Sequence, residues 1–306
     1  MNYKNIIKNR TVRIKILYFF SFIPDGLMIR IQYRIKTGHR LNLKNPRRFT
    51  EKIQWYKLYY KNPLMIQCVD KYDVRAYVKS KGFEEILVPC IGVYESPDEI
   101  DWDSLPDQFV MKDTLGCGGN AVIIVKDKNK EDVKKLKQQA LEWVKIDAHK
   151  KSGGREWPYY SGKQHRIIFE RYIESMNDEN FDNGIMDYKF FCFDGKVGLK
   201  WVDYDRFVDH KRVLFTPKGK RLNVECTYKS PKEFKYPKAA FDILQPIVDR
   251  LAEGFPHSRI DLYLVNNRPY FGEITFYSGS GYELFNDDRY DIWLGDKFKL
   301  PWKIRK

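Results

Sequence analysis

Lysine and glycine residues near the middle of the chain have the types and spacing that phosphate binding needs. Lys112 ends the apolar run FVMK, and a loop with Gly116, Gly118 and Gly119 follows it. Glycine lets backbone N–H groups approach a phosphate without a side chain in the way, and lysine supplies a compact positive charge. With the segment FERYIE at 169–174, this loop predicts part of a nucleotide site.

Two carboxylates near the end of the chain complete the predicted site. Asp261 and Glu273 lie on two strand-like runs joined at Asn266 and Asn267, and carboxylate oxygens are ligands that Mg²⁺ prefers. Because opposite residues in a strand pair point to the same face, a three-residue turn would bring the two carboxylates together. A two-residue turn would pair Asp261 with Gly272 instead and send Glu273 to the other face. Both turn lengths occur in hairpins, so the metal-site interpretation requires the longer turn, and an ordinary polar hairpin face is the alternative.

Alternating and helical patterns of apolar residues predict the elements that must position these side chains. Two apolar runs flank the glycine loop, as the strands of an antiparallel pair would. Helices are expected at 49–60, 63–81, 131–145 and 237–253. Strands are expected at 86–93, 109–112, 121–125, 166–173, 186–193 and 196–203, and as a pair within 259–276.

Several of these segments together resemble a known family. Lys112 before a glycine loop, Arg259-x-Asp261 and Glu273-x-Thr275 resemble the ATP-grasp superfamily of ATP-dependent ligases. Over about residues 37 to 300 the chain is more similar to its TupA-like group, which is named from teichuronopeptide synthesis and occurs with bacterial surface-polysaccharide enzymes. The segments that carry this closer resemblance are FTEKIQWYKLYY (49–60), VDKYDVRAYV (69–78), MDYKFFCFDGK (186–196) and FGEITF (271–276).

The resemblance implies an α+β ATP-grasp fold, with the nucleotide in a cleft between two α+β lobes. A basic helical extension would precede the lobes. The expected segments are a basic amphipathic extension at 1–48, a helical and linker region before the ATP-grasp lobes at 49–108, a small lobe with the glycine loop at 109–175, and a C-terminal lobe with the metal site at 176–306.

The resemblance also implies which residues hold ATP. Lys71 and Lys112 would face the phosphates, and Asp187 would bond the ribose hydroxyls. Plainer alternatives are an exposed surface lysine for Lys71, a turn or cap residue for Asp187 and a core residue for Tyr172. The full predicted set is Lys71, Lys112, Gly116, Gly118, Gly119, Glu170, Tyr172, Ile173 and Asp187.

A second group is implied to act on the transferring phosphoryl group. Arg259 would stabilise its charge, and Lys189 would face the same cleft as a second catalytic cation, unless it is a solvated surface lysine. Asp261, Glu273 and Thr275 would bind Mg²⁺, which bridges to phosphate oxygens. Members of the superfamily often carry Asn where this chain has Thr275, so the number of metal ions is left open.

The implied reaction is ATP-dependent joining of a carboxylate to an amine through an acyl phosphate. By resemblance, the acceptor is a surface polysaccharide or its lipid-linked precursor, for example a uronic acid that receives an amino acid or another amine. A glycosyltransferase that uses a nucleotide sugar is the main alternative, with Asp203-x-Asp205 as its DxD-like match. Arg206 would act in catalysis or form a salt bridge with Asp203. A non-catalytic membrane scaffold is the third reading of the chain.

Composition excludes several other classes of protein. The chain has 306 residues, of which 43% are hydrophobic and 31% charged, as in a soluble globular enzyme. Its five cysteines form no CxxC pair, which disfavours a disulfide framework or zinc site and favours a reducing cytoplasm. Its five histidines lack metal-ligand spacing, and neither a GxSxG elbow nor a Walker A motif is present.

The net charge of +14 is concentrated at the N-terminus. Residues 1–48 hold twelve Lys or Arg and only one acid, Asp25, around the apolar runs 16–24 and 26–31. These runs are too short and broken to span a bilayer, but cations beside apolar clusters suit the anionic inner face of the cell membrane. Alternatively, the apolar side chains pack on the catalytic body and the cations are only solvated. Nucleic acid is disfavoured because the chain has no RRM, KH or zinc-finger signature.

Overall fold

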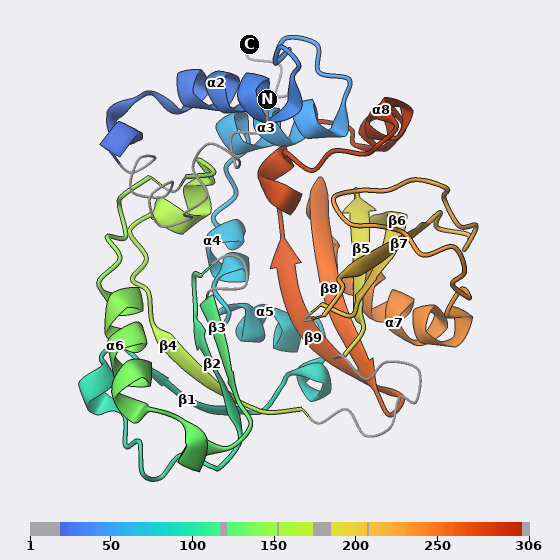
Figure 1. Ribbon diagram of the computed structural model, residues 1–306. Coiled ribbons are helices and arrows are strands. Elements are labelled where there is room, and N and C mark those ends of the chain that lie inside the picture. The colour runs from blue at the N-terminus through green and yellow to red at the C-terminus, as the bar shows by residue number, and fades with distance from the viewer. Residues whose placement is uncertain (1–18, 117–120, 152, 174–184, 207, 302–306) are drawn as a thin grey trace. The chain divides into compact units, whose positions relative to one another are not determined.

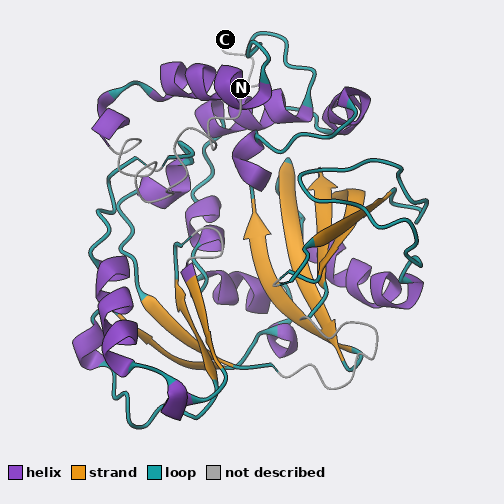
Figure 2. Cartoon of the chain, viewed as in Figure 1, coloured by secondary structure: helices purple, strands orange, loops and turns teal. Residues whose placement is uncertain are grey.

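The chain has an α+β fold with two antiparallel sheets, seen in a computed structural model that describes residues 19–116, 121–151, 153–173, 185–206 and 208–301 (Figure 1). The described residues form two compact units. The larger unit is drawn from Met1–Asn62, Ser152–Glu156 and Ser175–Lys306, and the smaller from Pro63–Lys151 and Trp157–Glu174. Each unit contains one of the sheets, which Figure 2 shows in orange.

The larger unit is built on a five-stranded sheet of order β7-β6-β5-β8-β9. Its strands are β5 (Asp187–Phe193), β6 (Lys196–Tyr204), β7 (Lys211–Phe215), β8 (His257–Val265) and β9 (Arg268–Thr275). Side chains alternate between the two faces of β5. Phe190 packs against Phe241 of α7 (Lys238–Leu251), whereas Phe191 packs against Phe49 of α3 (Phe49–Tyr59). Asp187 and Lys189 therefore share the face that α3 covers.

The hairpin β8–β9 brings the two predicted metal-binding carboxylates opposite each other. Asn266 and Asn267 form a two-residue turn with positive φ angles of 53° and 60°, typical of a type I′ turn. The expectation that a three-residue turn was required is therefore wrong. The register shifts by one residue between Asp261 and Leu262, so that Asp261 still pairs with Glu273.

Gly272 is the extra residue of this β-bulge, and the bulge sends Glu273 to the face of Asp261. A Cβ atom at Gly272 would lie 2.8 Å from the backbone oxygen of Asp261, so the close approach of the two strands requires glycine there.

The smaller unit contains a four-stranded sheet of order β1-β4-β2-β3. Its strands are β1 (Cys90–Tyr94), β2 (Phe109–Asp113), β3 (Val122–Val125) and β4 (Ile167–Arg171). The apolar stripe of α6 (Val133–Val144) packs on the core of this sheet, which includes Phe109, Met111 and Phe169. The paired strands on either side of the glycine loop are thus confirmed.

The helix expected at 63–81 is two helices, α4 (Leu64–Val69) and α5 (Val74–Ser80). Asp70 interrupts it, because its carboxylate accepts hydrogen bonds of 2.9 Å from the backbone N–H groups of Tyr72 and Asp73. The other predicted helices and strands are present with shifted ends. The short 3₁₀ helices within the described residues are Phe20–Phe22, Glu84–Ile86, Pro97–Glu99, Lys128–Lys130, Trp157–Tyr160 and Ser278–Gly281.

Two helices in the larger unit flank α3: α2 (Asp25–Thr37) and α8 (Asp288–Lys297). Tyr33 on α2 is fully buried and its hydroxyl lies 2.9 Å from that of Thr50, which in turn donates to Asp291 on α8 at 2.7 Å. The three helices thus form one packed layer. Within the described residues, no helix is long and apolar enough to cross a bilayer.

Candidate functional site

One nitrogen atom of Arg259 contacts oxygen atoms of three side chains of the hairpin β8–β9. Its Nη2 atom lies 2.8 Å from Asp261 Oδ2, 2.7 Å from Glu273 Oε1 and 3.1 Å from Thr275 Oγ1. Strand pairing explains this convergence, since Arg259 is opposite Thr275 and Asp261 is opposite Glu273. The three oxygen atoms thus form a cradle that holds a positive charge.

Strand β5 adds a second cation to this cluster. Lys189 is opposite Asp261 and its ammonium group forms ion pairs with both Asp187 and Asp261. Arg206 donates to Asp187 Oδ2 at 2.8 Å. Four predicted site residues, Asp187, Lys189, Arg206 and Asp261, are therefore joined in one chain of ion pairs.

The two buried cations stay charged in this setting. Burial lowers the pKa of Arg259, but Asp261 and Glu273 outweigh it, so that the pKa is raised overall. Burial likewise lowers the pKa of Lys189, but Asp187 and Asp261 outweigh it and raise it. Both cations therefore remain protonated at neutral pH while they are paired with carboxylates.

A second branch of the network was not predicted from the sequence. Arg259 Nη1 donates to Ser278 Oγ at 3.0 Å, and Ser278 donates to Glu283 at 2.7 Å. Glu283 accepts from Arg212 at 3.1 Å, and Arg212 binds both oxygens of Asp203 at 2.6 and 2.9 Å. The SGSG segment after β9, which contains Ser278, was the one feature of the sequence that could have indicated this branch.

The predicted salt bridge between Arg206 and Asp203 is not formed. Arg206 binds Asp187 instead, and Asp203 is buried beneath the guanidinium of Arg212. Burial alone would raise the pKa of Asp203, but the hydrogen bonds and positive charge of Arg212 hold it well below its usual value. Arg212 binds Asp203 in place of Arg206 because it lies directly opposite Asp203 in the pairing of β6 with β7.

In the smaller unit, Lys112 and Glu170 form an ion pair on the face shared by β2 and β4. Glu170 is buried, and its other oxygen lies 3.5 Å from Arg75 Nη1. Two residues that the sequence placed in one nucleotide site thus touch each other. Tyr172 and Ile173 follow directly after β4 and are half-buried.

Lys71 anchors the start of the glycine loop. Its ammonium donates to the backbone oxygens of Asp113 at 2.9 Å and Gly116 at 2.6 Å. A Cβ atom at Gly116 would lie 2.2 Å from that of Ala121, so this position requires glycine. Gly118 and Gly119 lie outside the described residues.

The sequence of the chain matches one family over most of its length. A family model described as TupA-like ATPgrasp matches residues 51–299. The chain belongs to this family. It is therefore an enzyme of the ATP-grasp class, whose members use ATP.

Solved structures similar to this TupA-like chain include two ligases of D-alanine. The Helicobacter pylori D-alanine–D-alanine ligase is 15% identical, with 82% of this chain and 69% of that chain covered and a TM-score of 0.45. The Bacillus anthracis enzyme complexed with ATP is 14% identical, with 69% and 55% covered and a TM-score of 0.42.

An L-amino acid ligase from Bacillus licheniformis is 16% identical, with 72% of this chain and 43% of that chain covered and a TM-score of 0.40. The TupA-like chain thus spans less than two thirds of the Bacillus ligases. No curated protein matches its sequence.

The oxygen cradle suits a divalent cation in its chemistry. Among the described residues, no group of three or more His, Cys, Asp and Glu side chains is arranged to hold a metal ion. The cradle of this TupA-like protein, however, combines two carboxylates with the hydroxyl of Thr275, and all three already meet one positively charged nitrogen. Oxygen donors of this kind fit Mg²⁺.

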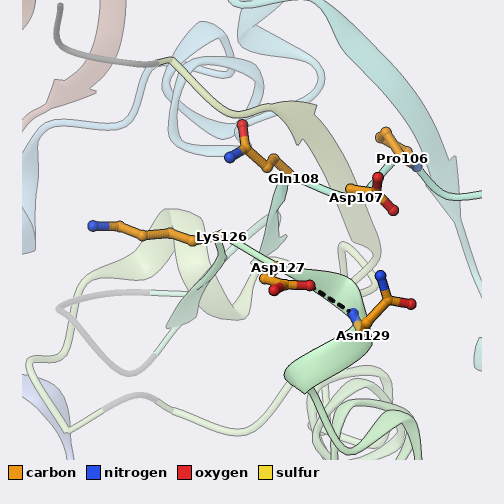
Figure 3. A pocket seen from close by; sticks show the side chains of 6 residues that line it. All are labelled: Pro106, Asp107, Gln108, Lys126, Asp127 and Asn129. Carbon is orange, nitrogen blue, oxygen red and sulfur yellow. Dashed lines mark hydrogen bonds between the residues drawn. The ribbon is translucent and has the colours of Figure 1, made fainter.

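A surface pocket in the smaller unit lies apart from the predicted site residues of that unit. It is found where β2 begins and β3 ends (Figure 3). Lys112 is near the other end of β2. Asp127 accepts a hydrogen bond of 3.1 Å from the backbone of Asn129 there. None of the predicted residues lines it; its lining is Pro106, Asp107, Gln108, Lys126, Asp127 and Asn129.

Proposed function

We propose that this TupA-like ATP-grasp enzyme is a carboxylate–amine ligase of bacterial surface-polysaccharide biosynthesis. It joins an amino acid or amine to a uronic acid or similar carboxylate, which is carried by a polysaccharide or a lipid-linked sugar. ATP supplies the free energy. Family membership supports the use of ATP, and the resemblance of the sequence to polysaccharide-associated members supports the substrate class.

The observation that carries the proposal is the convergence of Asp261, Glu273 and Thr275 on Arg259. Phosphoryl transfer is promoted mainly by positioning and by positive charge at the transferring group. A buried arginine held by two carboxylates beside a buried lysine provides such charge on a rigid sheet. Mg²⁺ would be held by the same three oxygen donors once Arg259 Nη2 exchanges its contacts with them for a phosphate oxygen, and would neutralise charge on the phosphate oxygens.

The proposed reaction has two steps. An oxygen of the substrate carboxylate attacks the terminal phosphorus of ATP, forming a new O–P bond as the bond to ADP breaks. The amine nitrogen then attacks the acyl carbon, the amide C–N bond forms, and the C–O bond to phosphate breaks. The amine loses its proton to solvent, and ADP, phosphate and the amide are released.

Within this reaction, the protein residues bind and orient the anionic groups. Arg259 and Lys189 would stabilise negative charge on the transferring group. Lys112 would bind a phosphate once its ion pair with Glu170 exchanges for ATP, and Lys71 would hold the glycine loop through its backbone oxygens. Asp187 would position the ribose while Arg206 balances its charge.

Transfer of an oxygen label tests the acyl phosphate step directly. The purified full-length chain would be given Mg-ATP, panels of amines and ¹⁸O-labelled uronic acids. The proposal predicts that ADP is formed and that phosphate gains one labelled oxygen from the carboxylate. ADP formation with unlabelled phosphate would show that the carboxylate is not phosphorylated and would overturn the proposed chemistry.

A further inference from the structure

The outer face of α2 carries an apolar stripe that no other part of the described chain covers. The stripe consists of Leu27, Ile31 and Ile35, whose spacing of four residues places them in one line along the helix. Their exposed fractions are 53%, 42% and 52%. Such side chains are usually buried, and here three in a row face outward.

The opposite face of the same helix is firmly packed in the larger unit. Ile29 and Tyr33 are fully buried, and Gln32 donates to the backbone oxygen of Gly153 at 2.8 Å. Lys36 stacks on the ring of Tyr282 at 4.0 Å. The inner face therefore fixes the orientation of α2, and the stripe stays on the exposed face.

An aromatic tip, defined as Phe19, Phe20 and Phe22, immediately precedes this helix. Phe19 and Phe22 have exposed fractions of 73% and 74%. The buried side chain of Arg155 holds the tip in place, because it donates to the backbone oxygens of Phe20 at 2.7 Å and Ser21 at 3.2 Å. The apolar surface is thus rigidly attached to the unit.

Two arginine residues lie beside the stripe on α2, and Asp25 is the one acid of the helix. Arg30 and Arg34 lie beside it on the exposed face of α2 and donate to the backbone oxygens of Leu41 and Gly38. Asp25 is the one acid in residues 19–48, and it is ion-paired with Arg155 at 3.1 Å. The surface around the stripe is therefore cationic.

We propose that the stripe and the aromatic tip dock this protein on an anionic lipid surface. Leu27, Ile31 and Ile35 would enter the boundary between headgroups and acyl chains, while Arg30 and Arg34 bind lipid phosphates. A second copy of the chain is a poorer occupant, because a symmetric interface would bring the arginines of the two copies together. A nucleic acid offers phosphate but no apolar phase to bury the stripe.

Sedimentation with vesicles tests this proposal on the full chain. Vesicles of phosphatidylcholine and phosphatidylglycerol in equal parts should bind the protein at low salt, and pure phosphatidylcholine vesicles should bind it much less. Arg30→Gln with Arg34→Gln should lower the partition coefficient about thirtyfold, at about fivefold for each lost cation. High salt should weaken the remaining binding.

A separate variant removes the apolar contribution. Leu27→Ser with Ile31→Ser and Ile35→Ser should also lose vesicle binding, while its thermal unfolding stays close to that of the natural chain because the three positions are exposed. Matched controls are Ile243→Ser on α7 and Lys134→Gln with Lys137→Gln on α6, which should bind vesicles like the natural chain.

Two results would overturn the proposal. One is that the natural chain stays in the supernatant at low salt with phosphatidylglycerol vesicles. The other is a dimer of the natural chain in sedimentation velocity without vesicles, together with a monomeric triple serine variant. That result would show that the stripe binds a second copy of the chain. The melting shift caused by Mg-ATP is measured in parallel, so failure of the ligase proposal and failure of lipid docking are distinguishable.

Discussion

At the residue scale, the site depends on how buried charges compensate one another. Asp261 is buried and touches both Arg259 and Lys189, whereas Glu273 lies at the margin with 48% of its side chain exposed. Removing one partner from a buried ion pair leaves the other charge without compensation, which costs more than the loss of an exposed pair. The two carboxylates should therefore differ in their effect on stability.

Glu273→Gln is expected to lower ligase turnover by about ten- to a hundredfold, as losses at metal-site partners do, while the free energy of unfolding changes by less than about 1 kcal/mol. Asp261→Asn should also lower turnover, but should cost about 3 kcal/mol of stability because Arg259 and Lys189 each lose one of their two carboxylate partners. ADP release and urea unfolding measure both effects. Asp242→Asn, on an exposed carboxylate of α7, is the control. Unchanged turnover in both site variants would remove these carboxylates from the mechanism.

His257 should make the stability of the protein depend on pH. Burial lowers its pKa from 6.5 to about 3, although the hydrogen bond to the backbone oxygen of Cys192 opposes this shift. Because the folded pKa lies below the unfolded pKa, the unfolded state gains a proton first as the pH falls. The contribution of neutral His257 is complete above pH 6.5 and is lost progressively toward pH 3.

Urea unfolding of His257→Phe and the natural chain between these pH values tests this linkage. The natural chain should lose about 1.4 kcal/mol more per pH unit than the variant, which corresponds to one proton. The aromatic rings of Phe49, Phe193 and Phe298 around the histidine favour a ring of similar size. Parallel slopes in the two proteins would contradict a neutral, buried His257.

At the element scale, the hairpin β8–β9 shows what the sequence could and could not predict. The alternation of apolar and polar residues predicted both strands, and the carboxylates of Asp261 and Glu273 predicted a metal site. The pairing register depended on a bulge at Gly272, which compensates for the two-residue turn and has no local signature other than glycine itself. Turn length alone was therefore insufficient to place the two carboxylates on one face.

Longer-range packing explains the elements that the sequence did not predict. Strand β7 begins with two cations and has only three apolar residues, and its pairing with β6 accompanies the burial of four of its five residues. Helix α8 contains Gly295, which disfavours a helix by propensity. A Cβ atom at Gly295 would lie 2.0 Å from the backbone oxygen of Arg47. Close packing against the segment that leads into α3 therefore requires glycine at this position. Arg212 was missed for the same reason, since only strand pairing brings it to Asp203.

The bulge can be tested by Gly272→Ala. The added methyl group would press on the backbone of Asp261, so we expect the variant to lose about 1 to 3 kcal/mol of stability and to lower turnover by moving Glu273. Gly26→Ala is the control, because a Cβ atom there meets nothing within 4 Å. Urea unfolding and ADP release compare the two. If Gly272→Ala has the stability and turnover of the natural chain, the close approach of the two strands at Gly272 is not needed.

At the scale of the whole molecule, the two faces of α2 differ in burial, and membrane binding by the N-terminal segment stays a prediction. One face of α2 packs on the larger unit and the other carries the exposed apolar stripe. Residues 1–18 lie outside the described structure, so the prediction for the cations there is unchanged. The four-segment division also remains a prediction.

Deletion of residues 1–37 is expected to destabilise the larger unit. Ile29 and Tyr33 are fully buried, and burying an apolar side chain of this size contributes about 1.5 to 3 kcal/mol. The soluble yield and melting temperature of the truncated chain measure the loss. A truncated chain that melts like the natural one would show that α2 contributes little to folding. Lipid docking is therefore better tested with substitutions on the exposed face.

Calorimetric titration with Mg-ATP tests the central claim most directly, because it needs no knowledge of the carboxylate or the amine. The natural chain should bind Mg-ATP at one site, and Lys112→Ala should bind it more weakly because a cation predicted to face the phosphates is lost. At a ligand concentration of about 100 Kd, binding should stabilise the natural chain by about 2.7 kcal/mol. UDP-sugars with Mn²⁺ should give no heat of binding. A chain that bound a UDP-sugar with Mn²⁺ and ignored ATP would contradict the account and favour a glycosyltransferase.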